Sequence, residues 1–152
     1  FMTLHEQIKE GIKTAMKAKD ETRLMVMRGM TSAFTNELVA TKRTPQDMLS
    51  DEEAIAVITR LAKQRKESMA QYETAGRPEL AEGEAKELAI LQEFLPTMMS
   101  VDEVRKIVEA KKAELGITDA SKKGMLVGAL MKDLKGKADG ADVKNVVDSL
   151  FS

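Results

Sequence analysis

Residues 50–76 read SDEEAIAVITRLAKQRKESMAQYETAG, and this stretch decides the fold class. Ser50 stands three residues before Glu53, which is the spacing of a capping box at the start of a helix. Apolar residues then recur at helical spacing, namely Ile55, Ile58, Leu61, Ala62, Met69 and Tyr72. Gly76 is placed to end this helix in a left-handed turn. The stretch therefore predicts one long amphipathic helix.

The sequence on either side predicts more helices. Pro78 suits the first position of a following helix, which should run to about Leu95. Toward the N-terminus, residues 4–18 have an apolar stripe of helical period. Asp20 then offers a cap for a second, longer helix that should end near Arg43.

A junction is expected at residues 96–99, where Pro96 ends the preceding helix. Ser100 and Glu103 resemble a second capping box, and two further short helices should follow. We predict an all-α fold, with a domain of about four helices at residues 2–96 and a small three-helix domain at 97–152. Met2 is interpreted as the native first residue.

The composition narrows the function classes. The chain has 152 residues, 43% of them apolar and 32% charged, so we expect a soluble protein with a packed core. No signal peptide and no run of about 20 apolar residues is seen, so a membrane segment is not expected. Together with the absence of Cys, this favours a cytoplasmic location. A net charge of −1 argues against a globally basic nucleic-acid binder but allows a local basic patch.

Residues for independent catalysis are scarce. His5 is the only His and is interpreted as a solvated side chain rather than a base or a ligand. The sequence contains no nucleophile elbow, phosphate loop or dinucleotide fingerprint. We therefore expect no catalytic residues, no metal and no cofactor.

Arg28 lies among methionines, four residues after Leu24, which places it near the predicted apolar face. A buried guanidinium needs a partner, so we predict a structural ion pair with Glu84 or Glu87. An Arg that binds an anion is the alternative. Arg65 falls near the apolar line of its own helix and is a second candidate for such a tether.

Lysines gather in the last third of the chain, with only Asp133 opposing them. They are Lys122, Lys123, Lys132, Lys135 and Lys137. Gly124 and Gly128 share one short helix, which suggests close approach of either a neighbouring helix or a phosphate. Gly136 and Lys137 lead into a helix capped by Asp139, an arrangement that can also present backbone N–H groups to phosphate. Turns and tight helix packing are the alternative reason for these glycines.

Many dispersed residues resemble the YqeY-like family. They include Lys63–Ser68, Tyr72, Ala75–Arg77, Leu80, Glu84, Glu87, Leu88, Phe94–Pro96, Gly124, Val127–Met131 and Lys135–Gly140. The resemblance implies an N-terminal helical domain and a smaller C-terminal one. It also implies kinship to the tail of the B subunit of the glutamine-dependent aspartyl/glutamyl-tRNA amidotransferase, a tail that resembles a tRNA-contacting appendage. The family label of carbon–nitrogen ligase with glutamine as amido donor would be inherited from that relative.

Two functions follow from these observations. The first is a non-catalytic tRNA-binding or translation-associated module. Its predicted contact residues are Lys122, Lys123, Gly128, Lys132, Lys135, Gly136 and Lys137. The alternative is an accessory subunit that contacts amidotransferase subunits without RNA. Salt-sensitive RNA binding separates the two.

Overall fold

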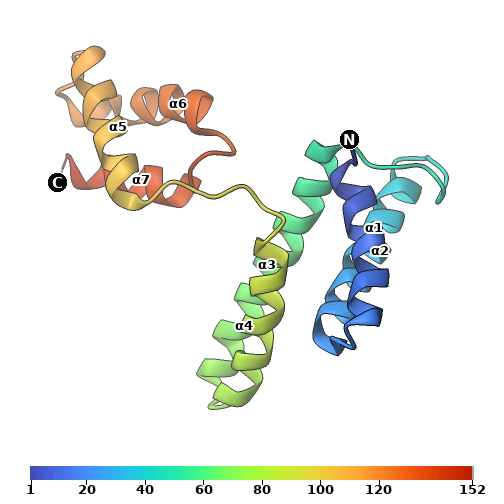
Figure 1. Ribbon diagram of the computed structural model, residues 1–152. Helices are drawn as coiled ribbons and strands as arrows, with labels where there is room; N and C mark the ends of the chain where they lie inside the picture. The colour runs from blue at the N-terminus through green and yellow to red at the C-terminus, as the bar shows by residue number, and fades with distance from the viewer. Residues whose placement is uncertain (152) are drawn as a thin grey trace. The chain divides into compact units, whose positions relative to one another are not determined.

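A computed structural model describes residues 1–151, which form seven α-helices and one short 3-10 helix, with no strand (Figure 1). The expected all-α class is confirmed for this part of the chain. The helices divide between two compact units, Phe1–Leu95 and Pro96–Ser152. No helix of residues 1–151 combines the length and apolar character that a membrane crossing needs.

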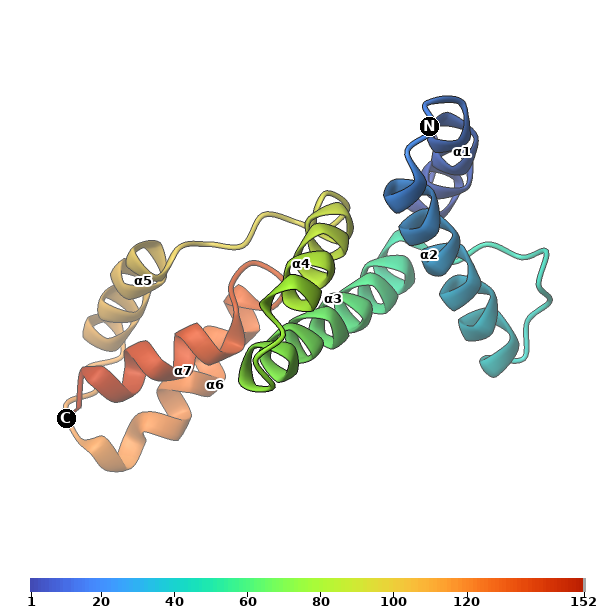
Figure 2. The same cartoon turned by 90° about the horizontal axis from the view of Figure 1, so that it is seen from below.

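The first unit consists of α1 (Leu4–Lys17), α2 (Glu21–Ala40), α3 (Asp51–Thr74) and α4 (Pro78–Gln92). The α1–α2 and α3–α4 pairs are antiparallel hairpins, as Figures 1 and 2 both show. Helix α2 contacts both α3 and α4, so it connects the two hairpins.

The helix boundaries follow local chemistry. The Ser50 capping box is present, because its hydroxyl accepts from the Glu53 N–H and the Glu53 carboxylate accepts from the Ser50 N–H. Gly76 ends α3 with a φ of 72°, in the left-handed region that glycine adopts without strain. Helix α4 stops at Gln92, three residues before the expected end. Residues 93–95 continue instead with i→i−3 hydrogen bonds before Pro96, which disfavours α geometry in the residue before it.

The core of the first unit is built from aliphatic side chains, methionine and one phenylalanine. Its fully buried members include Ile8, Met30, Phe34, Leu38 and Ile58, and they come from α1, α2 and α3. Met27 lies beneath Gly11 of α1, where a Cβ would stand 2.9 Å from the methionine Cε. This methionine fills the narrow space between the two helices of the first hairpin.

His5 corrects the sequence-based interpretation of a solvated side chain. Only 4% of its surface is exposed, and its Nδ1 accepts a 3.0 Å hydrogen bond from the backbone N–H of Leu49. Its ring centroid lies 4.8 Å from that of Phe34. Leu49 precedes the capped start of α3, where a buried backbone N–H needs an acceptor. His5 supplies that acceptor and joins α1 to the segment before α3.

We predict that His5 makes folding pH-dependent. Burial, followed by the charge of Lys9, lowers the pKa of His5 from its ordinary value of 6.5. The unfolded chain therefore binds a proton more readily than the folded one, so the free energy of unfolding should fall as the pH drops below about 6.5. Urea denaturation at a series of pH values measures this loss.

His5→Gln should flatten the dependence between pH 7.5 and 5.5, because it removes the titrating group. Glu53 does not interfere in this range. Its hydrogen bonds to Arg43 and Ser50 lower its pKa to about 2, so its contribution is lost only in acid below its ordinary 4.5. An unchanged pH profile in His5→Gln would assign the dependence to other groups.

The second unit contains α5 (Val101–Glu114), the 3-10 helix η1 (Ala120–Lys122), α6 (Lys123–Leu134) and α7 (Gly140–Ser149). Its core is aliphatic, and its fully buried residues are Val104, Val108, Leu126, Leu130, Val143 and Val147. The second capping box forms only in part. The Ser100 hydroxyl accepts from the Glu103 N–H at 3.2 Å, but the Glu103 carboxylate bonds that hydroxyl rather than the backbone.

Candidate nucleic-acid interface

The prediction that Arg28 is buried and paired with Glu84 or Glu87 is wrong. Arg28 is exposed, and its guanidinium Nη2 lies 4.0 Å from the sulfur of Met16. The buried stripe of α2 instead passes through Met27, Met30, Phe34 and Leu38. Arg28 follows Met27 by one residue, which turns its side chain about 100° away from this stripe.

Arg65 takes the place expected for Arg28. Its Nη1 donates to Oε2 of Glu84 at 2.9 Å and to Oε2 of Glu87 at 3.1 Å. The arginine side chain is 33% exposed, and the two carboxylate side chains are 16% and 18% exposed. The ion pair therefore ties α3 to α4 in a partly dehydrated position. Glu84 and Glu87 thus do take part in a structural ion pair, but their partner is Arg65 and not Arg28.

The five lysines of the predicted site lie at the two ends of α6 rather than in one cluster. Lys122 and Lys123 stand at its N-terminus, whereas Lys132 lies in its last turn and Lys135 and Lys137 lie in the connection to α7. The ten residues from Lys122 to Lys132 correspond to about 15 Å along a helix axis. A ligand that contacts both groups must therefore be extended.

Neighbouring side chains leave most of this positive charge free. Lys123 lies 3.5 Å from Asp148, and Asp133 lies 3.5 Å from Lys111 of α5. The only acidic residue within the lysine-rich segment thus has a cation from another helix beside it. The other four lysines are exposed and form no ion pair within residues 1–151; they are Lys122, Lys132, Lys135 and Lys137.

The face of α6 between the two lysine groups is open. Gly124 and Gly128 are exposed, and beyond its chain neighbours and the adjoining helix backbone a Cβ at either position would meet no atom of residues 1–151 within 4 Å. Tight packing against a neighbouring helix of this unit is therefore not the reason for these glycines. Gly136 has a φ of 78°, so its glycine is required by the turn after α6.

The start of α7 is capped from within. The Asp139 carboxylate accepts a 2.8 Å hydrogen bond from the Ala141 N–H. It thereby occupies the end of the helix that would otherwise attract a phosphate. Any anion near the loop that contains Gly136 has to be held by lysine side chains rather than by this helix terminus.

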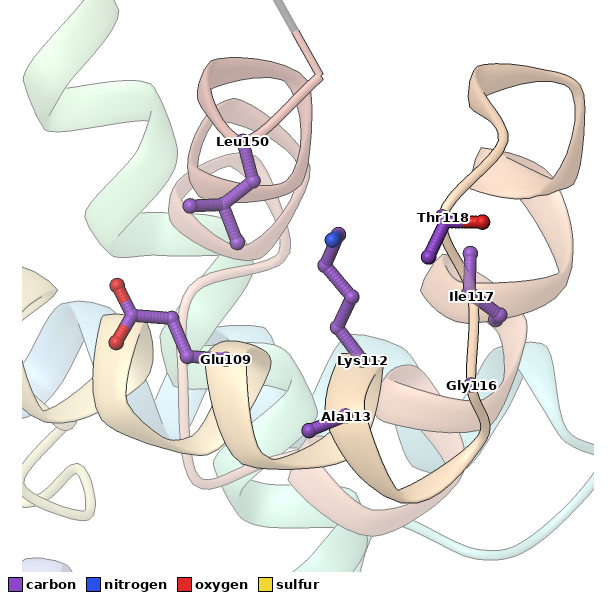
Figure 3. A pocket seen from close by; sticks show the side chains of 7 residues that line it. All are labelled: Glu109, Lys112, Ala113, Gly116, Ile117, Thr118 and Leu150. Carbon is purple, nitrogen blue, oxygen red and sulfur yellow. The ribbon is translucent and has the colours of Figure 1, made fainter.

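A shallow cavity of about 370 Å³ lies elsewhere in the second unit, between the end of α5 and Leu150 (Figure 3). Lys112 extends into the space between Leu150 and Thr118, whereas the Glu109 carboxylate points away from it. The Lys112 ammonium stands 5.2 Å from the centre of the Phe151 ring, within range of a cation–π contact. The other lining residues are Ala113, Gly116 and Ile117, so Lys112 is the one charged side chain that extends into this cavity. Residues 1–151 hold no group of His, Asp and Glu side chains arranged for a metal ion.

The family comparison covers almost the whole chain. The model of the family described as Yqey-like protein matches residues 5–151. The match includes both the Arg65 ion pair and the lysines around α6.

Curated relatives come from yeasts and are named altered inheritance of mitochondria protein 41, mitochondrial. The protein of Saccharomyces cerevisiae is 30% identical over 115 residues, covering 72% of this chain and 60% of its own length. The proteins of Kluyveromyces lactis and Vanderwaltozyma polyspora are 35% and 31% identical over 89 and 91 residues. These matches cover 57% and 60% of this chain, and 45% and 48% of the two relatives. The chain thus spans about half of the relatives' length.

Proposed function

Because the chain belongs to the YqeY-like family, we propose that it is a non-catalytic module that binds tRNA through the lysines at the two ends of α6. The observation that carries the proposal is the set of four exposed lysines without an ion-pair partner in residues 1–151, separated by the open glycine face of α6. Within the same proposal, residues 97–152 form the domain that resembles the amidotransferase B-subunit tail.

The arrangement suits a sugar–phosphate backbone better than a compact anion. Lysine side chains bind phosphates as mobile point charges, and their spacing of about 15 Å along α6 requires a ligand with several phosphates. The exposed glycines allow such a backbone to approach α6 closely between the two groups. Recognition of this kind reads charge and shape, so it needs no aromatic stacking residues.

Filter binding of purified chain to tRNA tests the proposal. We expect binding at low salt and a steep loss of affinity at moderate salt, because each neutralised phosphate releases counterions. Absence of binding at low salt would contradict the proposal. It would then favour an accessory subunit that contacts amidotransferase subunits through protein surfaces.

Gly128→Leu provides a separate prediction for the open face of α6. The free protein should become more stable by about 0.8 kcal/mol, because Leu is a much better helix former than Gly and a Cβ there meets only open space. Affinity for tRNA should nevertheless fall several-fold, since the side chain keeps the RNA backbone off the helix. Thermal denaturation and filter binding measure the two effects.

Ala110→Leu is the matched control, because it adds a similar side chain at an exposed position of α5. It should leave tRNA affinity unchanged. Equal affinity of Gly128→Leu and wild type would remove the glycine face from the proposed interface.

The proposal requires only a compartment that contains tRNA. The yeast relatives are named as mitochondrial proteins, so the cytoplasmic location expected from composition is not needed for it. The proposed role is binding alone, so it does not include the carbon–nitrogen ligase activity with which the family is labelled through the amidotransferase.

A further inference from the structure

A groove runs along the first unit between α2 on one side and α3 and α4 on the other. Its two halves have volumes of about 400 and 350 Å³ and share Met25 and Glu87 in their walls, so they adjoin each other. On α4 its lining residues extend from Glu79 to Leu91. This stretch measures about 18 Å along the helix axis, a little more than three helical turns.

The groove combines an apolar floor, buried except at Leu61, with an exposed apolar rim. Met30, Leu61 and Leu91 line its inner half. Met25 and Leu80 stand at its edge and are 54% and 38% exposed. A flexible methionine at the edge of an apolar groove adapts to the side chains of a partner.

Two glycines widen the groove, and the packing of the first unit does not require glycine at either position. Gly29 of α2 and Gly83 of α4 line it, and a Cβ at either position would meet open space. Each glycine weakens its helix by about 1 kcal/mol relative to alanine. Their absence of side chains leaves room for a partner between α2 and α4.

The charges of Glu84 and Glu87 are incompletely balanced. Both line the groove, and they share a single nitrogen of Arg65. Two carboxylates beside one guanidinium carry a local excess of negative charge, and each retains further acceptor sites. Lys86 also lines the groove but forms no ion pair with either carboxylate in the described residues, so a cation from a partner would complete this arrangement.

We propose that this groove binds one amphipathic helix of a partner protein, about three turns long, with a Lys or Arg opposite Glu84 and Glu87. Apolar side chains at i, i+4 and i+7 would fill the space beside Met25, Gly29 and Gly83. The proposal does not depend on tRNA binding, because the groove and the α6 lysines belong to different units. The chain would then have one surface for RNA and another for protein.

A displayed library of amphipathic helices about four turns long is the probe. Lys, Gln and Glu compete at the polar positions that flank the apolar face, and the immobilised chain of residues 1–152 is the bait. Lys should be enriched over Glu at one such position. Enriched peptides, made synthetically, should bind at least about tenfold more weakly to Gly83→Leu. They should bind Ala56→Leu as tightly as wild type, because Ala56 is exposed on α3 and lies outside the groove walls.

Four results would overturn this inference. The first three are that no peptide is enriched, that Glu is enriched over Lys, and that the peptides bind Gly83→Leu as tightly as wild type. The fourth is that Gly83→Leu weakens tRNA binding, which would assign the groove to the RNA site.

Sedimentation of the chain alone adds a fifth result: self-association that is lost in Gly83→Leu would make a second copy of the chain the occupant. Thermal denaturation confirms that Gly83→Leu is folded, with Gly29→Leu as an independent variant of the opposite wall. If the charge-reversed α6 lysines keep tRNA affinity, the RNA proposal fails while this one stands.

Discussion

Reversing Lys132, Lys135 and Lys137 to Glu should lower tRNA affinity by about two orders of magnitude. All three are exposed and free of ion pairs within residues 1–151, so their replacement strands no acidic partner there. Each lysine that contacts a phosphate contributes about one unit to the slope of log affinity against log salt. The triple variant should therefore show a slope shallower by about three as well as weaker binding.

A matched reversal of Lys17, Lys63 and Lys66 separates local from global charge. These exposed lysines lie on α1 and α3 of the first unit, and the variant changes the net charge by the same amount. Its tRNA affinity should stay within a few-fold of wild type. If both variants lose affinity equally, the effect is one of net charge, and the α6 lysines are not a specific interface. Both variants should unfold near the wild-type temperature, because isolated surface charges contribute little to stability.

The helices could be predicted because their signals are local. Ser50, Asp20, Gly76 and Pro78 act through hydrogen bonds and backbone preferences that involve only a few neighbouring residues. The same holds for Asp139 at the start of α7. The half-formed box at Ser100 shows the limit of such signals: sequence spacing places Glu103 within reach but does not decide which atom its carboxylate bonds.

The partners of buried polar groups could not be predicted, because they depend on how helices pack. Arg28 and Arg65 both lie near the apolar faces of their helices in sequence, and only the rotation of α2 and α3 decides which one reaches Glu84. His5 was missed for the same reason, since its partner, Leu49, is 44 residues away. A usable signal existed for Arg65, which stands four residues after Leu61 and four before Met69.

At the candidate interface too, the residues could be predicted from local sequence, whereas their arrangement in space could not. The sequence identified the lysines of α6 and its flanks and predicted a short helix among them. Their interpretation as one cluster did not take into account the roughly 15 Å that this helix places between Lys122 and Lys132. The sequence also left the role of Gly124 and Gly128 undecided between helix packing and an external ligand. The open space at both positions removes the first reading within the described unit.

Replacing Arg65 with Met should reduce the free energy of unfolding of the first unit by about 2 kcal/mol. The substitution keeps much of the apolar stem but leaves Glu84 and Glu87, both more than four-fifths buried, without their shared cation. Removing one partner of a fully buried ion pair costs about 3–5 kcal/mol, and the 33% exposure of Arg65 reduces that figure through solvent screening. Urea denaturation followed by circular dichroism measures the loss.

Comparison variants assign this loss to the stranded carboxylates rather than to the missing side chain. Adding Glu84→Gln and Glu87→Gln to Arg65→Met should restore most of the stability, because neutral amides tolerate the partly dehydrated position better than two unpaired charges. Arg28→Met should change stability by no more than about 0.5 kcal/mol, as expected of an exposed side chain. A triple variant as unstable as Arg65→Met would mean that the arginine stabilises α3 and α4 mainly through packing of its stem. An Arg28→Met variant as unstable as Arg65→Met would contradict the assignment of the structural ion pair to Arg65.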